Sequence, residues 1–302
     1  MYYSSPQTRL PLLTINGITP KVNNPSQYLL LLWLAIPVAA LAAPLNVFVT
    51  VPPLKTFVKT IGGEKIRVSS MIKPGQNPHT FSPTPQQITA LANASLYLKS
   101  SDLFERAWMS RIRSVNPGMK VVEINPAPNA LESDDGQDHH HESDPHFWTN
   151  PKTAIAMADA IGNALIAIDP AHADLYKENL NQFTTTLSSV DDQIRHKLRG
   201  LKKTTFLVVH PAWSHFANAY NLTQVAIEHE GKPPGGRAMA ALIELAKREE
   251  ISVIITQPQF SQQSAKQLAD AIDGEIVTVD PLSLEYQKTL LKMADLIARG
   301  AK

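Results

Sequence analysis

The chain of 302 residues contains no cysteine. This absence excludes disulfide bonds, thiolate ligands for a metal ion and a lipid carried on a cysteine side chain. An excess of one charge is also missing, because 28 Lys and Arg residues balance 27 Asp and Glu residues and leave a formal net charge of +1. Without a basic tract, the sequence does not favour nucleic acid as a partner. Any metal site must therefore use nitrogen and oxygen ligands.

The sequence also lacks an apolar run of the roughly 20 residues that a membrane-spanning helix needs. The run from Tyr28 to Ala43 has instead the length of a signal-peptide core, and Ala40-Leu41-Ala42 fits the A-x-A cleavage pattern. We therefore expect residues 1–42 to be a signal peptide with an N-terminal extension, cleaved after Ala42, and the mature protein to be periplasmic. An uncleaved membrane anchor is the alternative.

The mature chain alternates short β-branched runs with helical segments, a pattern typical of βαβ units in parallel sheets. We predict an α/β fold of two βα lobes, residues 43–168 with an acidic loop at 131–144, and residues 201–302. Between them, Asp169-Pro170 begins a helical pattern with one apolar stripe that ends near Gly200. At 1.5 Å per residue, a helix over residues 169–200 would be roughly 40 Å long. We expect it to be a rigid backbone that joins the lobes.

Four short strings each place one potential metal ligand next to a proline: Asn77-Pro78-His79, Asp144-Pro145-His146, Val209-His210-Pro211 and Val279-Asp280-Pro281. His210 and Asp280 close the predicted strands TFLVVH and EIVTVD, and open parallel sheets bind ligands at the carboxyl ends of their strands. Each histidine alone is more simply explained as a hydrogen-bonded structural residue. Together, three imidazoles and one carboxylate form a complete tetrahedral zinc set. The sequence thus predicts His79, His146, His210 and Asp280 as ligands of one metal ion in a cleft between the lobes.

Three further histidines, His139, His140 and His141, lie in the string ESDDGQDHHHESD. No apolar residue anchors this segment, and its acidic composition is typical of a solvated loop. They are candidates for an auxiliary loop that collects metal and feeds the cleft. A merely solvated loop is the alternative.

In this order, the strings resemble the metal-binding class of solute-binding proteins that serve ATP-binding-cassette importers, the zinc and manganese receptors. The resemblance covers the whole mature chain and rests on the segments MIKPGQNPHTFSPTP, DPHFWTNP, DPAHADLYKENL, VVHPAWSHFANAY, ITQPQFSQQSAKQLA and VDPLS. It implies the same four ligands and a fold of two similar βα lobes joined by a rigid helix. It also implies a monomer that delivers its ion to a membrane permease with a cytoplasmic ATPase.

The third ligand position is histidine in proteins that resemble zinc receptors and glutamate in those that resemble manganese receptors. Here it is His210, and nitrogen-rich ligation suits zinc, whereas manganese prefers oxygen ligands. We therefore expect Zn²⁺ as the transported ion, with Mn²⁺ as the alternative. Two positions depart from the family pattern: Gln257 stands where an acidic residue is expected, and His215 stands in place of an aromatic residue.

An enzyme that uses the same residues is the competing function. Catalytic zinc usually has three protein ligands and an open position for water, whereas four protein ligands close the tetrahedron. The sequence has no H-E-x-x-H pair either. We therefore expect a receptor and not a metallohydrolase. A surface adhesin or a periplasmic metal buffer would share the fold and the site but would lack the permease.

Overall fold

The computed structural model describes residues 43–100, 103–126, 144–229 and 231–300. The chain consists of two units, Met1–Ala42 and Ala43–Lys302, and both lobes belong to the second unit. The predicted signal peptide, residues 1–42, lies outside the described residues. So do His139, His140 and His141.

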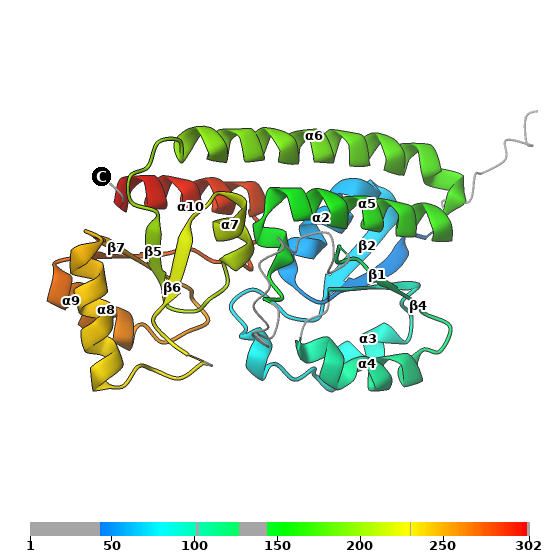
Figure 1. Ribbon diagram of the computed structural model, residues 1–302. Helices are drawn as coiled ribbons and strands as arrows, with labels where there is room; N and C mark the ends of the chain where they lie inside the picture. The colour runs from blue at the N-terminus through cyan, green and yellow to red at the C-terminus, as the bar shows by residue number, and fades with distance from the viewer. Residues whose placement is uncertain (1–42, 101–102, 127–143, 230, 301–302) are drawn as a thin grey trace, which may run out of the picture. The chain divides into compact units, whose positions relative to one another are not determined.

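The N-terminal lobe contains a parallel four-stranded sheet in the order β2-β1-β3-β4 (Figure 1). Its strands are β1 (Leu45–Val49), β2 (Ile66–Ser70), β3 (Leu96–Lys99) and β4 (Lys120–Glu123). In the parallel pairing, Val47 of β1 lies opposite Val68 of β2 on one side and opposite Leu96 of β3 on the other. All four strands occupy runs that the sequence predicts to be extended, because their β-branched residues suit a sheet that is covered on both faces.

Helices cover both faces of this sheet. They are α2 (Pro52–Gly62), α3 (Pro85–Leu91), α4 (Leu103–Val115) and α5 (Pro151–Ile168). Successive side chains of a strand point to opposite faces, so Val47 packs in the core that includes residues of α2 and α5, while Phe48 packs in the core under α3 and α4. Asn150 caps α5, since its Oδ1 accepts a hydrogen bond from the backbone N–H of Lys152 at 2.9 Å.

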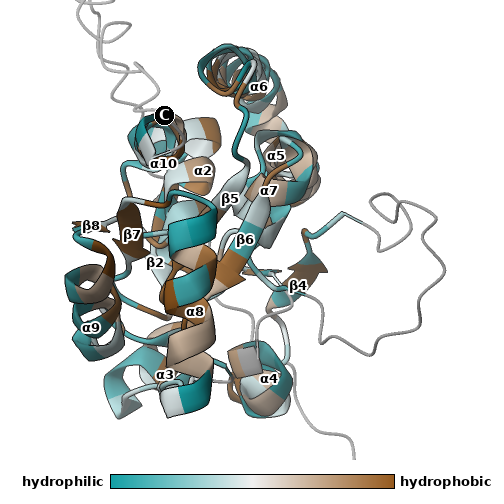
Figure 2. Cartoon of the chain, turned by 60° about the vertical axis from the view of Figure 1, so that its left-hand side comes forward, coloured by the Kyte–Doolittle hydropathy of each residue, from teal (hydrophilic) through white to brown (hydrophobic). Residues whose placement is uncertain are grey.

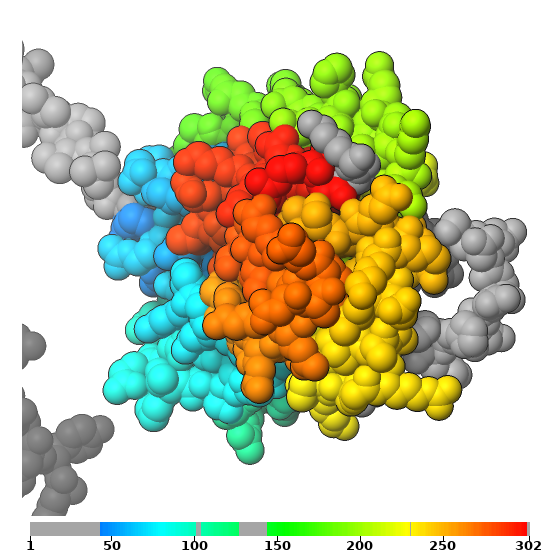
Figure 3. All heavy atoms as spheres, turned by 90° about the vertical axis from the view of Figure 1, so that its left-hand side faces the viewer, coloured from blue at the N-terminus to red at the C-terminus, as the bar shows by residue number. Residues whose placement is uncertain are grey.

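The C-terminal lobe repeats this arrangement with a parallel sheet in the order β6-β5-β7-β8. Its strands are β5 (Thr205–Val208), β6 (Thr223–Ala226), β7 (Val253–Thr256) and β8 (Glu275–Thr278). Its helices are α7 (Ser214–Ala219), α8 (Gly236–Arg248), α9 (Gln263–Ile272) and α10 (Tyr286–Gly300). Strand β7 is buried along its whole length and is coloured brown in Figure 2. On the face that Figure 3 turns to the viewer, α9 (orange) and α10 (red) lie at the surface.

The long helix α6 (Ala173–Lys197) packs against both lobes, as predicted for the joining helix. A 3₁₀ turn, η7 (Pro170–His172), precedes it, and Gly200 follows its end with a φ of 75°. Among the described residues, no single helix has the length and hydropathy of a membrane span; α5 and the segment Pro170–Lys197 pass that test only as a pair, bent by 118°. Hydrogen bonds from Asn179 to Ile61 O (2.9 Å) and from Tyr220 to Asp191 (2.8 Å) tie α6 to one lobe and then to the other.

Candidate metal site

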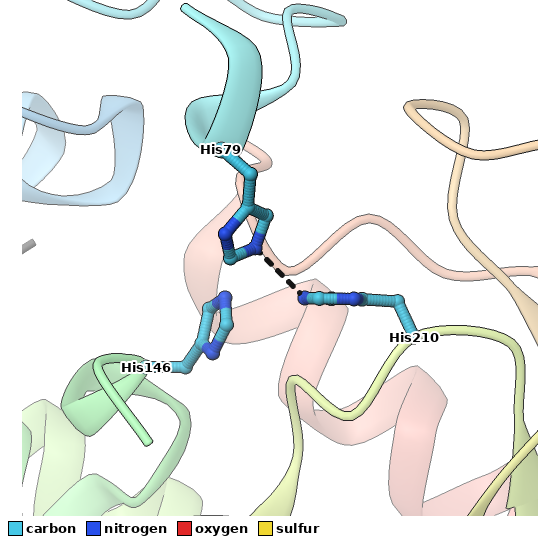
Figure 4. A group of neighbouring side chains, drawn as sticks. All are labelled: His79, His146 and His210. Atoms are coloured by element: carbon cyan, nitrogen blue, oxygen red, sulfur yellow. Dashed lines mark hydrogen bonds between the residues drawn. The ribbon is translucent and has the colours of Figure 1, made fainter. Parts of the chain in front are cut away.

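The rings of His79, His146 and His210 point toward one another (Figure 4). One nitrogen from each ring belongs to a group in which all candidate ligand atoms lie within 4.8 Å of one another. The Nε2 atoms of His79 and His210 are 3.1 Å apart. Such separations suit a single ion about 2 Å from each nitrogen, the usual length of a zinc–imidazole bond. The structure therefore brings together three of the four ligands predicted from the sequence.

His79 follows β2 and lies in the short 3₁₀ turn η4 (Pro78–Thr80). Asn77 precedes this turn, and its Oδ1 accepts a hydrogen bond from the His79 backbone N–H at 2.9 Å. Pro78 is buried and His79 is exposed, so the turn is anchored at the proline while the imidazole stands at the rim of the group. The Asn-Pro-His string thus orients this side chain through local backbone chemistry.

His146 lies between β4 and α5 and is held by Asp144. Oδ1 of Asp144 accepts hydrogen bonds from the His146 backbone N–H at 2.9 Å and from its ring Nδ1–H at 2.5 Å. With Nδ1 donating to a carboxylate, Nε2 carries the lone pair that a metal requires. Burial raises the pKa of Asp144, but the adjacent His146 outweighs it through its charge and hydrogen bond, so the pKa lies well below its usual range. Asp144 is therefore an ionised acceptor.

His210 has an equivalent carboxylate partner from a different part of the chain. Its Nδ1–H donates to Oε1 of Glu228 at 2.7 Å, which again leaves Nε2 for a metal. Its ring stacks on Phe260, with centroids 4.2 Å apart and an angle of 12° between the planes. Burial lowers the pKa of His210 and outweighs the opposing effect of Glu228. A lowered pKa keeps this imidazole neutral, the form that binds a metal.

Gln257, one of the two departures from the family pattern, holds the backbone of His210. Its Oε1 accepts from the His210 backbone N–H at 3.2 Å, and its Nε2 donates to the His210 carbonyl oxygen at 2.8 Å. The side chain is fully buried. An ionised carboxylate has no N–H to donate, so an acidic residue would lose the second of these bonds.

The other departure, His215, does not belong to the group of ring nitrogens. It stacks on Phe147 with ring centroids 4.5 Å apart, and its Nε2 lies 2.8 Å from the carbonyl oxygen of Asp144. It comes from α7 in the C-terminal lobe and supports the segment that carries His146 in the N-terminal lobe. This residue therefore acts on the site indirectly, through Asp144.

Asp280, the fourth predicted ligand, lies just after β8 and outside the group of ring nitrogens. Its Oδ1 accepts hydrogen bonds from Gln259 Nε2 at 2.8 Å and from the Leu282 backbone N–H at 2.9 Å. The following residues, Pro281 and Leu282, line a cavity of about 10 Å³ together with the three histidines. That volume is about enough for one water-sized body. It suits a single ion, and it leaves no room there for an organic substrate.

The two carboxylates that accept from the ring nitrogens, Asp144 and Glu228, were not identified from the sequence. The local sequence could have indicated the role of Asp144, because an Asp two residues before a histidine can hydrogen-bond to both the backbone and the ring of that histidine. The local sequence gave no such indication for Glu228, because Glu228 lies near His210 only where the chain segments that follow β5 and β6 pair with each other. There, the Glu228 backbone N–H donates to Val209 O at 3.1 Å.

Known proteins resemble this chain over most of its described length. Residues 47–300 match the family model described as ZnuA, zinc-uptake complex component A, periplasmic. The chain is 27% identical over 273 residues to the high-affinity zinc uptake system protein ZnuA of Bacillus subtilis, covering 85% of each protein. It is 26% identical over 251 residues to the zinc-binding lipoprotein AdcA of Streptococcus pneumoniae, covering 79% of this chain and 50% of AdcA. The chain thus spans about half the length of this curated relative.

A solved structure supports the same relationship. The crystal structure of a ZnuA has a TM-score of 0.80 and 31% sequence identity, and the match covers 86% of this chain and 100% of that chain. The resemblance found from the sequence and the fold predicted from it are therefore confirmed. This family is one of binding components for zinc uptake and not of enzymes. The chain belongs to the family of ZnuA, the periplasmic component A of the zinc-uptake complex.

Proposed function

We propose that this protein captures zinc in the periplasm with high affinity and delivers it to the permease of an ATP-binding-cassette importer. The observation that carries this proposal is the group formed by His79, His146 and His210, whose candidate ligand atoms lie within 4.8 Å of one another. Membership of the zinc-uptake family supports the same function.

Zinc is favoured over manganese because the converging groups are imidazoles. Two carboxylates beside the histidines, Asp144 and Glu228, accept hydrogen bonds from ring Nδ1 atoms through one oxygen each. These carboxylates would therefore not bind the ion directly. Each would raise the basicity of the imidazole that binds the ion, and would offset part of the ion's charge. A site with three nitrogen ligands suits zinc, whereas manganese prefers an oxygen-rich site. A manganese receptor of the same class is the alternative.

The full ligand set that we propose is His79, His146, His210 and Asp280. Asp280 is included because the segment that follows it, Pro281 and Leu282, lines the same cavity as the histidines. An ionised carboxylate at the fourth position would neutralise half of the charge of the ion. Four protein ligands would also complete the tetrahedron and leave no position for a catalytic water.

We further propose the domain organisation predicted above, with residues 1–42 as a signal peptide and N-terminal extension, and lobes at 43–168 and 201–302 joined by residues 169–200. The ends of α5 at Ile168 and of α6 at Lys197 support these boundaries. The protein would act as a periplasmic monomer, with a membrane permease and its cytoplasmic ATPase as partners. His139, His140 and His141 would serve as an auxiliary metal-collecting loop.

The test is calorimetric titration of the metal-stripped, exported protein with zinc and with manganese. We expect one tight zinc site, much weaker manganese binding, and a loss of zinc affinity of at least about 100-fold in His210→Ala. The matched control is His196→Ala, an exposed histidine on α6. Preferential manganese binding would overturn the choice of metal. The absence of a tight site for either ion would overturn the ligand set.

Delivery is tested separately, in membrane vesicles that contain the matching permease and its ATPase. The loaded protein should stimulate zinc uptake into these vesicles, and His210→Ala should not. A protein that binds zinc tightly but fails to stimulate uptake would be a metal buffer or an adhesin, and the receptor function would be wrong.

A further inference from the structure

The segment that follows β7 contacts both candidate ligands of the C-terminal lobe. Gln257 holds the backbone of His210 through two hydrogen bonds, and Phe260 stacks on its ring. Between them in sequence, Gln259 donates a hydrogen bond to Asp280. Three of the four residues in the segment 257–260 thus contact the third and the fourth candidate ligand. Because all of these contacts lie within one lobe, a movement between the lobes would leave them in place.

The bond between Gln259 and Asp280 has a defined direction. An ionised carboxylate only accepts hydrogen bonds, so the amide nitrogen of Gln259, and not its oxygen, must face Asp280. Oδ1 of Asp280 accepts from Gln259 Nε2 at 2.8 Å and from the Leu282 backbone N–H at 2.9 Å. Across the part of the chain that the structure describes, no donor is bonded to Oδ2. The two oxygens of this carboxylate are therefore not equivalent.

Gln259 also lies at the metal cavity itself. It lines the cavity of about 10 Å³ together with His79, His146 and His210. The residue that donates to Oδ1 of Asp280 is thus also part of the lining of this cavity. This position differs from that of a surface glutamine that merely supports a turn.

We propose that Gln259 is a selectivity-determining residue of the metal site, an inference that rests on the function proposed above. Together with the Leu282 backbone N–H, Gln259 occupies Oδ1 and leaves Asp280 one oxygen for the ion, which favours monodentate binding. Three nitrogens and one oxygen satisfy four-coordinate zinc. Manganese prefers a higher coordination number and more oxygen ligands, and a bidentate carboxylate would supply one more. Gln259 therefore discriminates against manganese without touching the ion.

The experiment compares the wild type with Gln259→Leu, which replaces the amide with an apolar side chain of comparable bulk that donates no hydrogen bond. Affinities for zinc and for manganese are measured by competition with a chelator, and the visible spectrum of bound Co²⁺ reports the coordination number. We expect zinc affinity to fall by about 10-fold, as for the loss of other groups that orient a metal ligand. Manganese affinity should be unchanged or higher. The Co²⁺ absorption should weaken, because tetrahedral Co²⁺ absorbs more strongly than five- or six-coordinate Co²⁺.

Two further variants complete the design. Gln259→Glu keeps the size of the side chain but cannot donate to Asp280 when ionised, so the ratio of zinc to manganese affinity should fall here as well. Gln267→Leu is the matched control, since this exposed glutamine on α9 lines a neighbouring cavity whose lining contains none of the three histidines. Its affinities and Co²⁺ spectrum should equal those of the wild type.

A zinc-to-manganese ratio and a Co²⁺ spectrum that stay at wild-type values in both Gln259 variants would overturn the inference. An equal change in Gln267→Leu would overturn it too. A variant that lowers only the melting temperature would identify Gln259 as a support for the turn at Leu282. If the wild type itself had no tight zinc site, the proposed function would fail first, so the two failures are distinguishable.

Discussion

The indole N–H of Trp148 donates a hydrogen bond to the carbonyl oxygen of Pro281 at 2.8 Å, across 133 positions of sequence. The hydroxyl of Tyr286 donates in turn to the carbonyl oxygen of Trp148 at 2.6 Å. Trp148 lies two residues after His146, and Pro281 follows Asp280 directly. These bonds therefore join the segment that carries a candidate ligand in one lobe to the segment that carries another in the second lobe.

Trp148→Phe removes the indole N–H and leaves the buried Pro281 carbonyl oxygen without this donor. We expect the free energy of unfolding to fall by about 1–3 kcal/mol, the cost of leaving a buried polar group unpaired. Zinc affinity should fall too, because two ligand-bearing segments lose their connection. Urea unfolding and zinc titration measure the two effects. Trp108→Phe, on α4, is the control and should leave zinc affinity unchanged; an equal loss in both variants would contradict the assignment.

Glu228→Gln keeps a hydrogen-bond acceptor for Nδ1 of His210 but removes the negative charge. The imidazole becomes a weaker base toward the ion, and we expect zinc affinity to fall by about 10- to 100-fold. Competition with a zinc chelator measures the change. Glu244→Gln on α8, which alters an exposed carboxylate, should have no effect. Unchanged zinc binding in Glu228→Gln would show that this carboxylate does not tune His210.

The stability of the metal-stripped protein should depend on pH through His210. Burial lowers the pKa of His210 below its ordinary value of 6.5, so the unfolded chain takes up a proton here at a higher pH than the folded protein does. The contribution of His210 to the free energy of unfolding is therefore fully present above pH 6.5. It is lost as the pH falls toward the pKa of His210 in the folded protein. Melting curves between pH 7.5 and 5.5 should show a smaller loss for His210→Gln than for the wild type. Parallel losses would exclude His210 as the source.

Tyr220→Phe tests the attachment of α6 to the C-terminal lobe. Asp191 is buried on α6, and its two oxygens accept hydrogen bonds from Tyr220 at 2.8 Å and from Arg195 Nε at 3.0 Å. Without the tyrosine hydroxyl, one carboxylate oxygen loses its partner, and stability should fall by about 1–3 kcal/mol. Zinc affinity should be unaffected, because this contact lies on the joining helix. A selective loss of zinc affinity would contradict a purely structural role.

Strand periodicity was sufficient to predict both sheets, but not where the strands end. The run TFLVVH predicted a strand as far as His210, whereas β5 ends at Val208. The reason is that the His210 backbone N–H donates to the side chain of Gln257, a bond that no pattern along the strand could indicate. Likewise α6 begins at Ala173 and not at Asp169, because Pro170–His172 forms a separate 3₁₀ turn.

The site could be predicted only in part, for a similar reason. The three histidines were identifiable because each lies next to a proline, with His210 at the end of a predicted strand. The partners of Asp280 were not, since Gln259 reaches it from a neighbouring strand end 21 positions away. Contacts of this kind depend on the order of strands in the sheet, which a local pattern does not encode. Asp280 as a metal ligand stays a prediction.

The cavity beside the three histidines has a consequence for the speed of exchange. At about 10 Å³, it is far smaller than a zinc ion with its shell of water molecules. An ion bound beside the exposed ring of His79 must therefore have given up water, and water must return before the ion can depart. The residence time of the ion then depends on how easily solvent reaches that ring, and not only on the strength of the bonds that hold it.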